Sequence, residues 1–98
     1  MRVLKPEINI IKNNILKFDK DAQVYLFGSR VDDNKKGGDI DILIISDLIK
    51  KYDLIKIEYL IFQQIDEQKI DFIISKKNIT NNFIKMILSK NVINLCQI

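Results

Sequence analysis

The sequence predicts a small α/β (α+β) domain, in which a three- or four-stranded mixed sheet carries helices mainly on one face. Short apolar runs of strand length alternate with longer segments whose apolar residues recur every three or four positions. With 98 residues, of which 47% are hydrophobic, the chain has the length of one domain and enough apolar residues for a core. The helical segments are too few for a doubly wound sheet. We therefore expect a single domain over residues 1–98.

The first third of the chain is expected to form a helix, a strand and a loop. Apolar residues recur at helical spacing over 6–20, and Pro6 is tolerated because the first helical turn does not use its missing N–H. The apolar run 22–27 ends at a glycine, which predicts a buried strand. Residues 31–38 are polar and end in two glycines, which predicts a loop, with room for one helical turn starting at Ser29.

The middle of the chain is expected to form a central strand and a long helix. Residues 39–46 begin with alternating acidic and apolar residues and then become wholly apolar, as in a strand covered on both faces. Residues 47–65 are expected to be helical. The apolar residues that predict this helix are Leu48, Tyr52, Ile55, Tyr59 and Phe62. We expect the three tyrosines, Tyr25, Tyr52 and Tyr59, to pack in the core with their hydroxyl groups reaching an edge.

The last third of the chain is expected to form a strand, a helix and a short edge strand. Residues 69–75 are a third apolar run. Asn78 or Thr80 can cap a final helix that continues to about residue 90, with Asn91 as a left-handed stop. Residues 92–96 are expected to form the edge strand.

Composition excludes several classes of chemistry. The sequence has no histidine, and Cys96 is its single cysteine, so imidazole-based catalysis, a disulfide framework and a cysteine zinc site are excluded. The net charge of +3 is too small to predict strong direct binding of nucleic acid. Charged residues interrupt the N-terminal apolar stretch, and no apolar run approaches the roughly 18 residues of a membrane span. We therefore expect a cytoplasmic protein that does not bind a membrane.

Two acidic residues at the head of the central strand predict a metal site. Asp39 and Asp41 lie two positions apart, so both project from one face of the sheet. Two carboxylates at such a short distance repel each other unless a cation lies between them. The rest of the strand is wholly apolar, where an unpaired charge is costly. A divalent ion held by oxygen, Mg²⁺ or Mn²⁺, would resolve this conflict. The alternative is that Asp39 simply begins the strand at the surface and Asp41 caps a turn.

Two further features favour the metal site. Gly28 and Ser29 follow the first strand directly, where backbone N–H groups can cradle a phosphate. A third acid, Asp71, interrupts the apolar run of the third strand. Phosphoryl or nucleotidyl transfer by two metal ions needs such a set of carboxylates and phosphate donors.

These residues resemble the signature of the DNA polymerase β-like nucleotidyltransferase superfamily. That signature is Gly followed by Gly or Ser, a loop of roughly ten residues, an Asp-hydrophobic-Asp-hydrophobic strand and a third acid on a later strand. The sequence carries it as Gly28-Ser29-Arg30, Asp39-Ile40-Asp41-Ile42 and Asp71. The resemblance covers about residues 22–74 and implies a polymerase β-like nucleotidyltransferase core. The loop 31–36 departs from close relatives because it lacks their small and Arg-rich residues.

Length indicates one branch of this superfamily. Other branches append helical domains that hold the base and the second substrate, whereas this sequence contains only the core. It is similar to the minimal nucleotidyltransferases of bacteria and archaea, the MNT family. That resemblance implies an antitoxin whose partner is a HEPN-domain ribonuclease toxin, in a hetero-oligomer. It also implies transfer of AMP from ATP to a tyrosine of that toxin, with Mg²⁺, as two ions, for cofactor.

The resemblance also implies a role for each site residue. Gly28 and Ser29 bind the β- and γ-phosphates. Asp39 and Asp41 ligate both metal ions. Asp71 ligates the catalytic ion and helps to deprotonate the attacking hydroxyl group.

The basic residues near the site are less defined. Arg30 either contacts a phosphate or pairs with Asp32 or Asp33 at the surface. Lys35 and Lys36 are expected to lie on the loop without contacting substrate.

Two functions of different classes remain open, and a third, weaker one is a subunit that binds substrate RNA or a small molecule together with its partner. The first is an adenylyltransferase that acts on a partner protein. The second is a non-catalytic, nucleotide-binding scaffold that neutralises its partner by contact alone. The three acids in core strands favour the enzyme, because a scaffold has no need to keep them.

Overall fold

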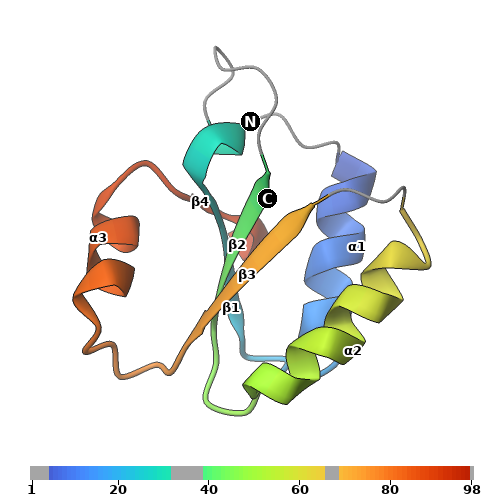
Figure 1. Ribbon diagram of the computed structural model, residues 1–98, viewed down its shortest axis with the longest axis horizontal. Helices are drawn as coiled ribbons and strands as arrows, with labels where there is room; N and C mark the ends of the chain where they lie inside the picture. The colour runs from blue at the N-terminus through green and yellow to red at the C-terminus, as the bar shows by residue number, and fades with distance from the viewer. Residues whose placement is uncertain (1–4, 32–38, 66–68, 98) are drawn as a thin grey trace.

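The computed structural model of the chain describes residues 5–31, 39–65 and 69–97. Within these ranges the elements follow in the predicted order, with α1 and α2 beside one face of the sheet and α3 beside the other (Figure 1). They are α1 (Lys5–Leu16), β1 (Gln23–Phe27), the 3-10 helix η1 (Gly28–Val31), β2 (Ile40–Ile45), α2 (Lys51–Phe62), β3 (Ile70–Ser75), α3 (Asn82–Ser89), β4 (Ile93–Asn94) and the 3-10 helix η2 (Leu95–Gln97). Each described helix is too short or too polar to cross a membrane.

The four strands form one mixed sheet in the order β3-β2-β1-β4. Strand β1 runs antiparallel to both β2 and β4, whereas β2 and β3 are parallel. Parallel neighbours need a long crossover connection, and helix α2 supplies it. As a result, the first residues of β2 and β3 lie at the same end of the sheet as the last residues of β1. The prediction of a mixed sheet with three or four strands is confirmed, with four.

Both faces of the central strand β2 are buried, in two separate apolar clusters. Ile40, Ile42 and Ile44 pack on the side of α1 and α2, which contribute buried isoleucines such as Ile11 and Ile57. The alternate residues of β2 face α3. This second cluster is built on Leu43, Ile45, Ile84 and Ile87. Because side chains of a strand alternate between faces, the wholly apolar second half of β2 anchors helices on both sides of the sheet.

Helix α2 begins four residues later than the sequence pattern predicts. The hydroxyl oxygen of Ser46 accepts the backbone N–H groups of Leu48 and Ile49 at 3.1 and 3.0 Å, which holds this segment in a turn. The helix then starts at Lys51. The backbone N–H of Lys50 donates to the Asp53 carboxylate at 2.9 Å, half of a capping box. The helical prediction for 47–50 is therefore wrong, because a serine turn and a cap use these backbone groups instead.

The predicted buried face of α2 is also wrong. The face that packs on the sheet contains Ile57 and Ile61, both fully buried. Four of the five residues used to predict the helix are exposed, with exposed fractions of 65% for Leu48, 71% for Tyr52, 73% for Ile55 and 64% for Tyr59, whereas the fifth, Phe62, packs partly buried against the core. The four exposed residues are named here the α2 row; Tyr52, Ile55 and Tyr59 form a second apolar stripe on α2, and Leu48 precedes the helix. Periodicity identifies both stripes but does not determine which one meets the sheet.

The remaining tyrosine behaves as predicted. Tyr25 packs against the cluster on the α3 side, and its hydroxyl group donates to the side chain of Gln23 at 3.2 Å. Tyr52 and Tyr59 instead leave their hydroxyl groups in water, where no buried partner is needed.

Helix α3 starts later than predicted and ends differently. Its N-cap is Asn81, whose side-chain oxygen accepts the backbone N–H groups of Phe83 and Ile84 at 2.7 and 3.2 Å. Neither Asn78 nor Thr80 caps the helix. Its C-cap, Lys90, has an extended backbone, and no described non-glycine residue has a positive φ, so the left-handed stop predicted at Asn91 is wrong. The edge strand that follows is confirmed, as the two-residue β4 beside β1.

Candidate active site

The predicted acidic residues gather at one end of the sheet. Asp41 is the second residue of β2 and Asp71 the second residue of β3. The two are direct partners in the parallel register, and Phe27 is the partner of Asp41 on its other side, in β1. Partners on neighbouring strands project to the same face, about 4.8 Å apart along the hydrogen-bonding direction. The sheet therefore places the two carboxylates side by side, next to the last residue of β1.

These carboxylates open toward the face of the sheet that carries α3. Asp41 projects from the same face of β2 as Leu43 and Ile45, which pack under that helix. At the end of the sheet the cover is incomplete, so Asp41 is partly exposed and Asp71 is exposed. The prediction that Asp71 interrupts a core element is wrong in this respect, because β3 is an edge strand. Its exposure leaves the carboxylate accessible to a ligand.

Gly28 lies directly against Asp41. It has a φ of +78°, a left-handed conformation that residues with a side chain rarely adopt. A Cβ atom built on Gly28 would collide with Oδ2 of Asp41 and lie only 3.3 Å from its Cγ. The chain then turns at once into η1, which confirms the helical turn predicted after the first strand. Only glycine lets the backbone both turn here and approach the carboxylate so closely.

The environment of Asp41 disfavours its charged form. Burial raises the pKa of Asp41 above its ordinary value, and the carboxylates of Asp71 and Asp39 raise it further. Lys69 opposes this effect by lowering the pKa. The acidic neighbours of Asp41 at this sheet end therefore make its charged form less favourable.

Asp39 lies just before β2 and pairs with a residue that the sequence analysis did not single out. Its Oδ2 is 3.4 Å from the Nζ of Lys69, with side-chain exposed fractions of 42% and 72%. An ion pair this exposed contributes little stability. The parallel register explains the contact. Ile40 pairs with Ile70, so the residues just before them, Asp39 and Lys69, also lie side by side. A parallel β-α-β unit inferred from sequence could have revealed it.

The three acids do not converge on one point. Among the described residues, no three acidic, cysteine or histidine side chains lie close enough together to hold one ion. The donor set nevertheless fits a divalent cation, since carboxylate oxygens are its preferred ligands. Gly28 also keeps the space above Asp41 Oδ2 free of any side chain. The ligand roles of Asp39, Asp41 and Asp71 stay predictions.

The other predicted site residues lie partly or wholly beyond the described structure. Ser29 and Arg30 belong to η1, but their side chains are outside the described part of the chain. Lys35 and Lys36, like Asp32 and Asp33, also fall outside the described residues. Their predicted roles stay predictions.

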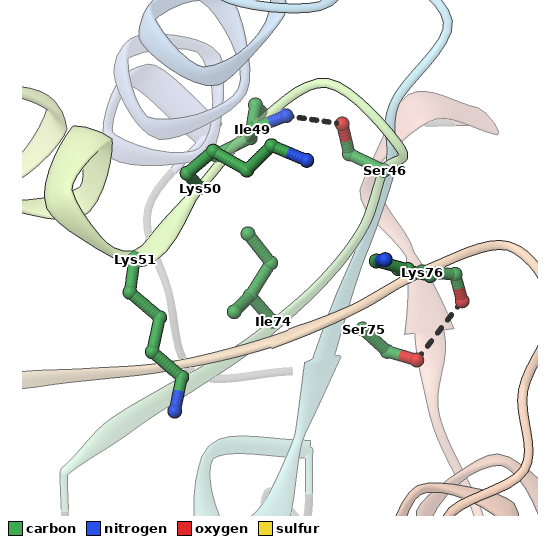
Figure 2. A pocket seen from close by; sticks show the side chains of 7 residues that line it. All are labelled: Ser46, Ile49, Lys50, Lys51, Ile74, Ser75 and Lys76. Atoms are coloured by element: carbon green, nitrogen blue, oxygen red, sulfur yellow. Dashed lines mark hydrogen bonds between the residues drawn. The ribbon is translucent and has the colours of Figure 1, made fainter.

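A cavity at the opposite end of the sheet does not belong to this site. It lies between the start of α2 and the ends of β2 and β3 (Figure 2). Its volume is about 230 Å³. Lys50, Lys51 and Lys76 line it, but no carboxylate does. Its buried hydroxyl, Ser46, is already engaged, because it donates to Asp19 at 2.6 Å and accepts backbone N–H groups. This cavity contains no predicted site residue.

The fold and the acidic sheet end together define a small α+β domain with two paired carboxylates at one end of its mixed sheet. A family model described as "Nucleotidyltransferase domain" matches residues 8–94. The chain belongs to this family, and its mixed sheet with three helices agrees with a polymerase β-like nucleotidyltransferase core. It is therefore a transferase domain for nucleotidyl groups. No individual curated protein matches the chain.

Proposed function

We propose that this nucleotidyltransferase domain moves AMP from ATP to a tyrosine hydroxyl group of a HEPN-domain ribonuclease toxin, and so acts as an antitoxin in the cytoplasm. The observation that carries the enzymatic part of the proposal is the in-register pair Asp41 and Asp71 beside Gly28. A glycine turn that admits a phosphate and two adjacent carboxylates are the parts that nucleotidyl transfer needs. The identity of the partner rests on the resemblance to the minimal nucleotidyltransferases.

In the proposed reaction, the acceptor oxygen attacks the α-phosphorus of ATP. The bond between that phosphorus and the oxygen bridging to the β-phosphate breaks, and pyrophosphate leaves. Asp71, exposed at the sheet edge, accepts the proton of the attacking hydroxyl group. The backbone at Gly28 and Ser29 orients the β- and γ-phosphates.

Asp39, Asp41 and Asp71 are the residues that would hold Mg²⁺, as one or two ions. Bound Mg²⁺ offsets phosphate charge and orients the triphosphate. The residues themselves supply the reason for binding: the pKa of Asp41 is raised by its acidic neighbours, and a cation removes that repulsion. Asp39 would exchange its exposed ion pair with Lys69 for the cation, at little cost in stability.

The α2 row supports a protein partner. Four large apolar side chains, each more than 60% exposed, lie at positions 48, 52, 55 and 59, the last three of them along α2. Isolated exposed apolar residues are normal, but a continuous stripe of this kind is typical of a protein-binding surface. Helix α2 lies on the opposite face of the sheet from α3, toward which Asp41 projects, so a partner bound to the row leaves the acidic sheet end accessible.

The enzymatic proposal is tested with the HEPN-domain protein encoded beside this chain. Purified domain, labelled ATP, Mg²⁺ and that protein are incubated, and the partner is weighed by intact mass spectrometry. We expect the mass of one or more AMP groups to be added. Asp71→Ala should abolish the transfer and leave complex formation intact, because Asp71 faces the reaction site. Ser29→Ala should slow it roughly 10- to 100-fold, since it removes one donor and keeps the backbone donors.

Asp21→Ala is the matched control, because Asp21 is an exposed acid outside the sheet end and its loss should not change transfer. If the wild-type domain neutralises the toxin equally well without ATP, and Asp71→Ala protects equally well, the enzymatic proposal is wrong. The non-catalytic scaffold would then be the function.

A further inference from the structure

A cavity of about 200 Å³ lies beside the acidic sheet end, between α3 and the end of β1. Its residues come from β1, from α3 and from the segment that leads into β4. They are Phe27, Gly28, Phe83, Met86, Ile87, Lys90, Asn91 and Val92. Gly28 is therefore shared: one side of it borders this cavity, and the other meets the carboxylate of Asp41.

The wall formed by α3 is more apolar than the fold requires. Ile84 and Ile87 already anchor this helix to the sheet. Phe83 and Met86 lie on a neighbouring side of the helix, and their exposed fractions are 50% and 44%. Both line the cavity, so their apolar surface faces an open space and not the core. Exposed apolar side chains that converge on a cavity are typical of a ligand site.

We propose that this cavity holds the base of the bound nucleoside triphosphate. The inference rests on the proposed function, because it assumes that the triphosphate binds at Gly28 and the acids. Phosphates placed against the backbone of Gly28 leave the nucleoside to extend along the α3 side, where the cavity begins. The apolar walls suit the faces of a planar ring, which stack on aromatic and apolar side chains.

Size and polarity favour the base over a larger group. Cavities that enclose a whole drug-sized ligand are typically about 300–1,000 Å³. A volume of about 200 Å³ therefore suits one ring system, with ribose and phosphates outside. The polar groups of the lining come from Lys90 and Asn91 at one end of it. An asparagine amide both donates and accepts, which matches the N6 and N7 edge of adenine.

Comparing two ligands distinguishes the contribution of the base to binding from that of the phosphates. Calorimetry measures the affinity of the domain for a non-hydrolysable ATP analogue and for inorganic triphosphate, each with Mg²⁺. We expect Phe83→Ala to weaken the analogue roughly 10-fold or more and to leave inorganic triphosphate unchanged. Lys85→Ala is the matched control, because it truncates an exposed side chain of the same helix that does not line the cavity.

A measurement on the wild-type domain avoids any effect of the variant on folding. The sequence has two methionines, so the Met86 methyl group is readily resolved by NMR after isotope labelling. A purine ring in the cavity should shift this methyl signal, whereas inorganic triphosphate should not.

The outcomes distinguish the two proposals. Equal affinity for both ligands, or an unchanged Met86 signal with the bound analogue, overturns the cavity as the base site and leaves the transferase proposal standing. An equal loss of both ligands in Phe83→Ala overturns it as well. A wild-type domain that binds neither ligand overturns both proposals.

Discussion

The backbone of Gly28 and the carboxylate of Asp41 are in contact across the sheet end, with no room for a side chain between them. Phe27, the residue before the glycine, is the partner of Asp41 in the antiparallel register, so the sheet itself fixes this approach. The turn out of β1 therefore has two requirements at one position. It needs the left-handed φ of +78° and it needs the absence of a Cβ.

Gly28→Ala is expected to destabilise the domain and to abolish nucleotide binding. The left-handed conformation alone costs a residue with a side chain about 1–3 kcal/mol. The new methyl group also collides with Asp41 Oδ2, so the carboxylate must move. Thermal unfolding should show the loss as a fall in Tm, at about 4–8 °C for each kcal/mol in a domain of this size.

A second variant separates the two causes. Asp41→Ala removes the colliding oxygen, and the Asp41 Cβ that remains lies 3.6 Å from the position of the new methyl group, an ordinary contact. The loss of Tm caused by Gly28→Ala should therefore be smaller in the Asp41→Ala background. An identical loss in both backgrounds would show that backbone strain is the whole effect.

Asp41→Asn is expected to stabilise the metal-free domain while abolishing transfer. Burial and the neighbouring acids raise the folded-state pKa of Asp41 above its ordinary value of 3.8, so its charge costs stability at neutral pH. Asparagine has no charge, and the gain should be on the order of 1 kcal/mol or less. The loss of stability that the charged Asp41 causes in the wild type disappears as the pH falls through the raised pKa toward 3.8. The variant should therefore exceed the wild type in Tm at pH 7 and not at pH 3.

Mg²⁺ with a non-hydrolysable ATP analogue should reverse this order. The pair binds the wild-type site and raises its Tm by mass action, whereas the asparagine variant should gain little. A metal-free variant with a lower Tm than the wild type at pH 7 would contradict the repulsion between the acids and indicate a structural role for Asp41.

Ser46→Ala is expected to cost about 1–3 kcal/mol, because it removes a donor from a buried carboxylate. The Ser46 hydroxyl donates to Asp19 at 2.6 Å and is the main cause that lowers the pKa of Asp19 below 3.8. A lowered folded-state pKa adds stability above pH 3.8, and that stability is lost as the pH falls through the folded-state pKa. The difference in Tm between wild type and variant should therefore be largest near pH 7 and shrink below pH 3.8.

The exposed serine of α3 provides a control for this variant. Ser89 donates to the backbone oxygen of Met86 at 2.7 Å within the same helix, so Ser89→Ala should leave the Tm almost unchanged at every pH. A pH-independent difference for Ser46→Ala would mean that Asp19 does not sense the hydroxyl.

The strands of the sheet and the glycine turn beside the site could be predicted from the sequence, for identifiable reasons. Strands with wholly apolar runs, such as β2, can form only in a covered sheet, and glycine after β1 fixed the turn into η1. These features depend on local pattern and on the connection length, both of which are written in the sequence.

Features that depend on how distant segments pack against one another could not be predicted from the sequence. Helix α2 has two apolar stripes, and the sheet selected Ile57 and Ile61 over the α2 row. Ser46 was not expected to be buried, because its partner Asp19 lies 27 residues away in the sequence. The cavity beside Gly28 depends on how α3 and β4 pack, and no local signal marks Phe83 as different from a core residue.

Ile55→Asp is expected to prevent the domain from binding its HEPN-domain partner while leaving fold and nucleotide binding unchanged. Ile55 is 73% exposed at the centre of the α2 row, so the substitution disturbs little in the free domain. A carboxylate buried without a partner in an apolar interface is costly, which should weaken the complex at least 10-fold.

Size-exclusion chromatography with light scattering and calorimetry measure the complex, and Tm with and without Mg²⁺ and the ATP analogue checks the domain. Lys85 is an exposed residue of α3, so Lys85→Asp is the control for an added acid. A complex unchanged by Ile55→Asp but lost in Lys85→Asp would place the partner on the α3 side, over the acidic sheet end.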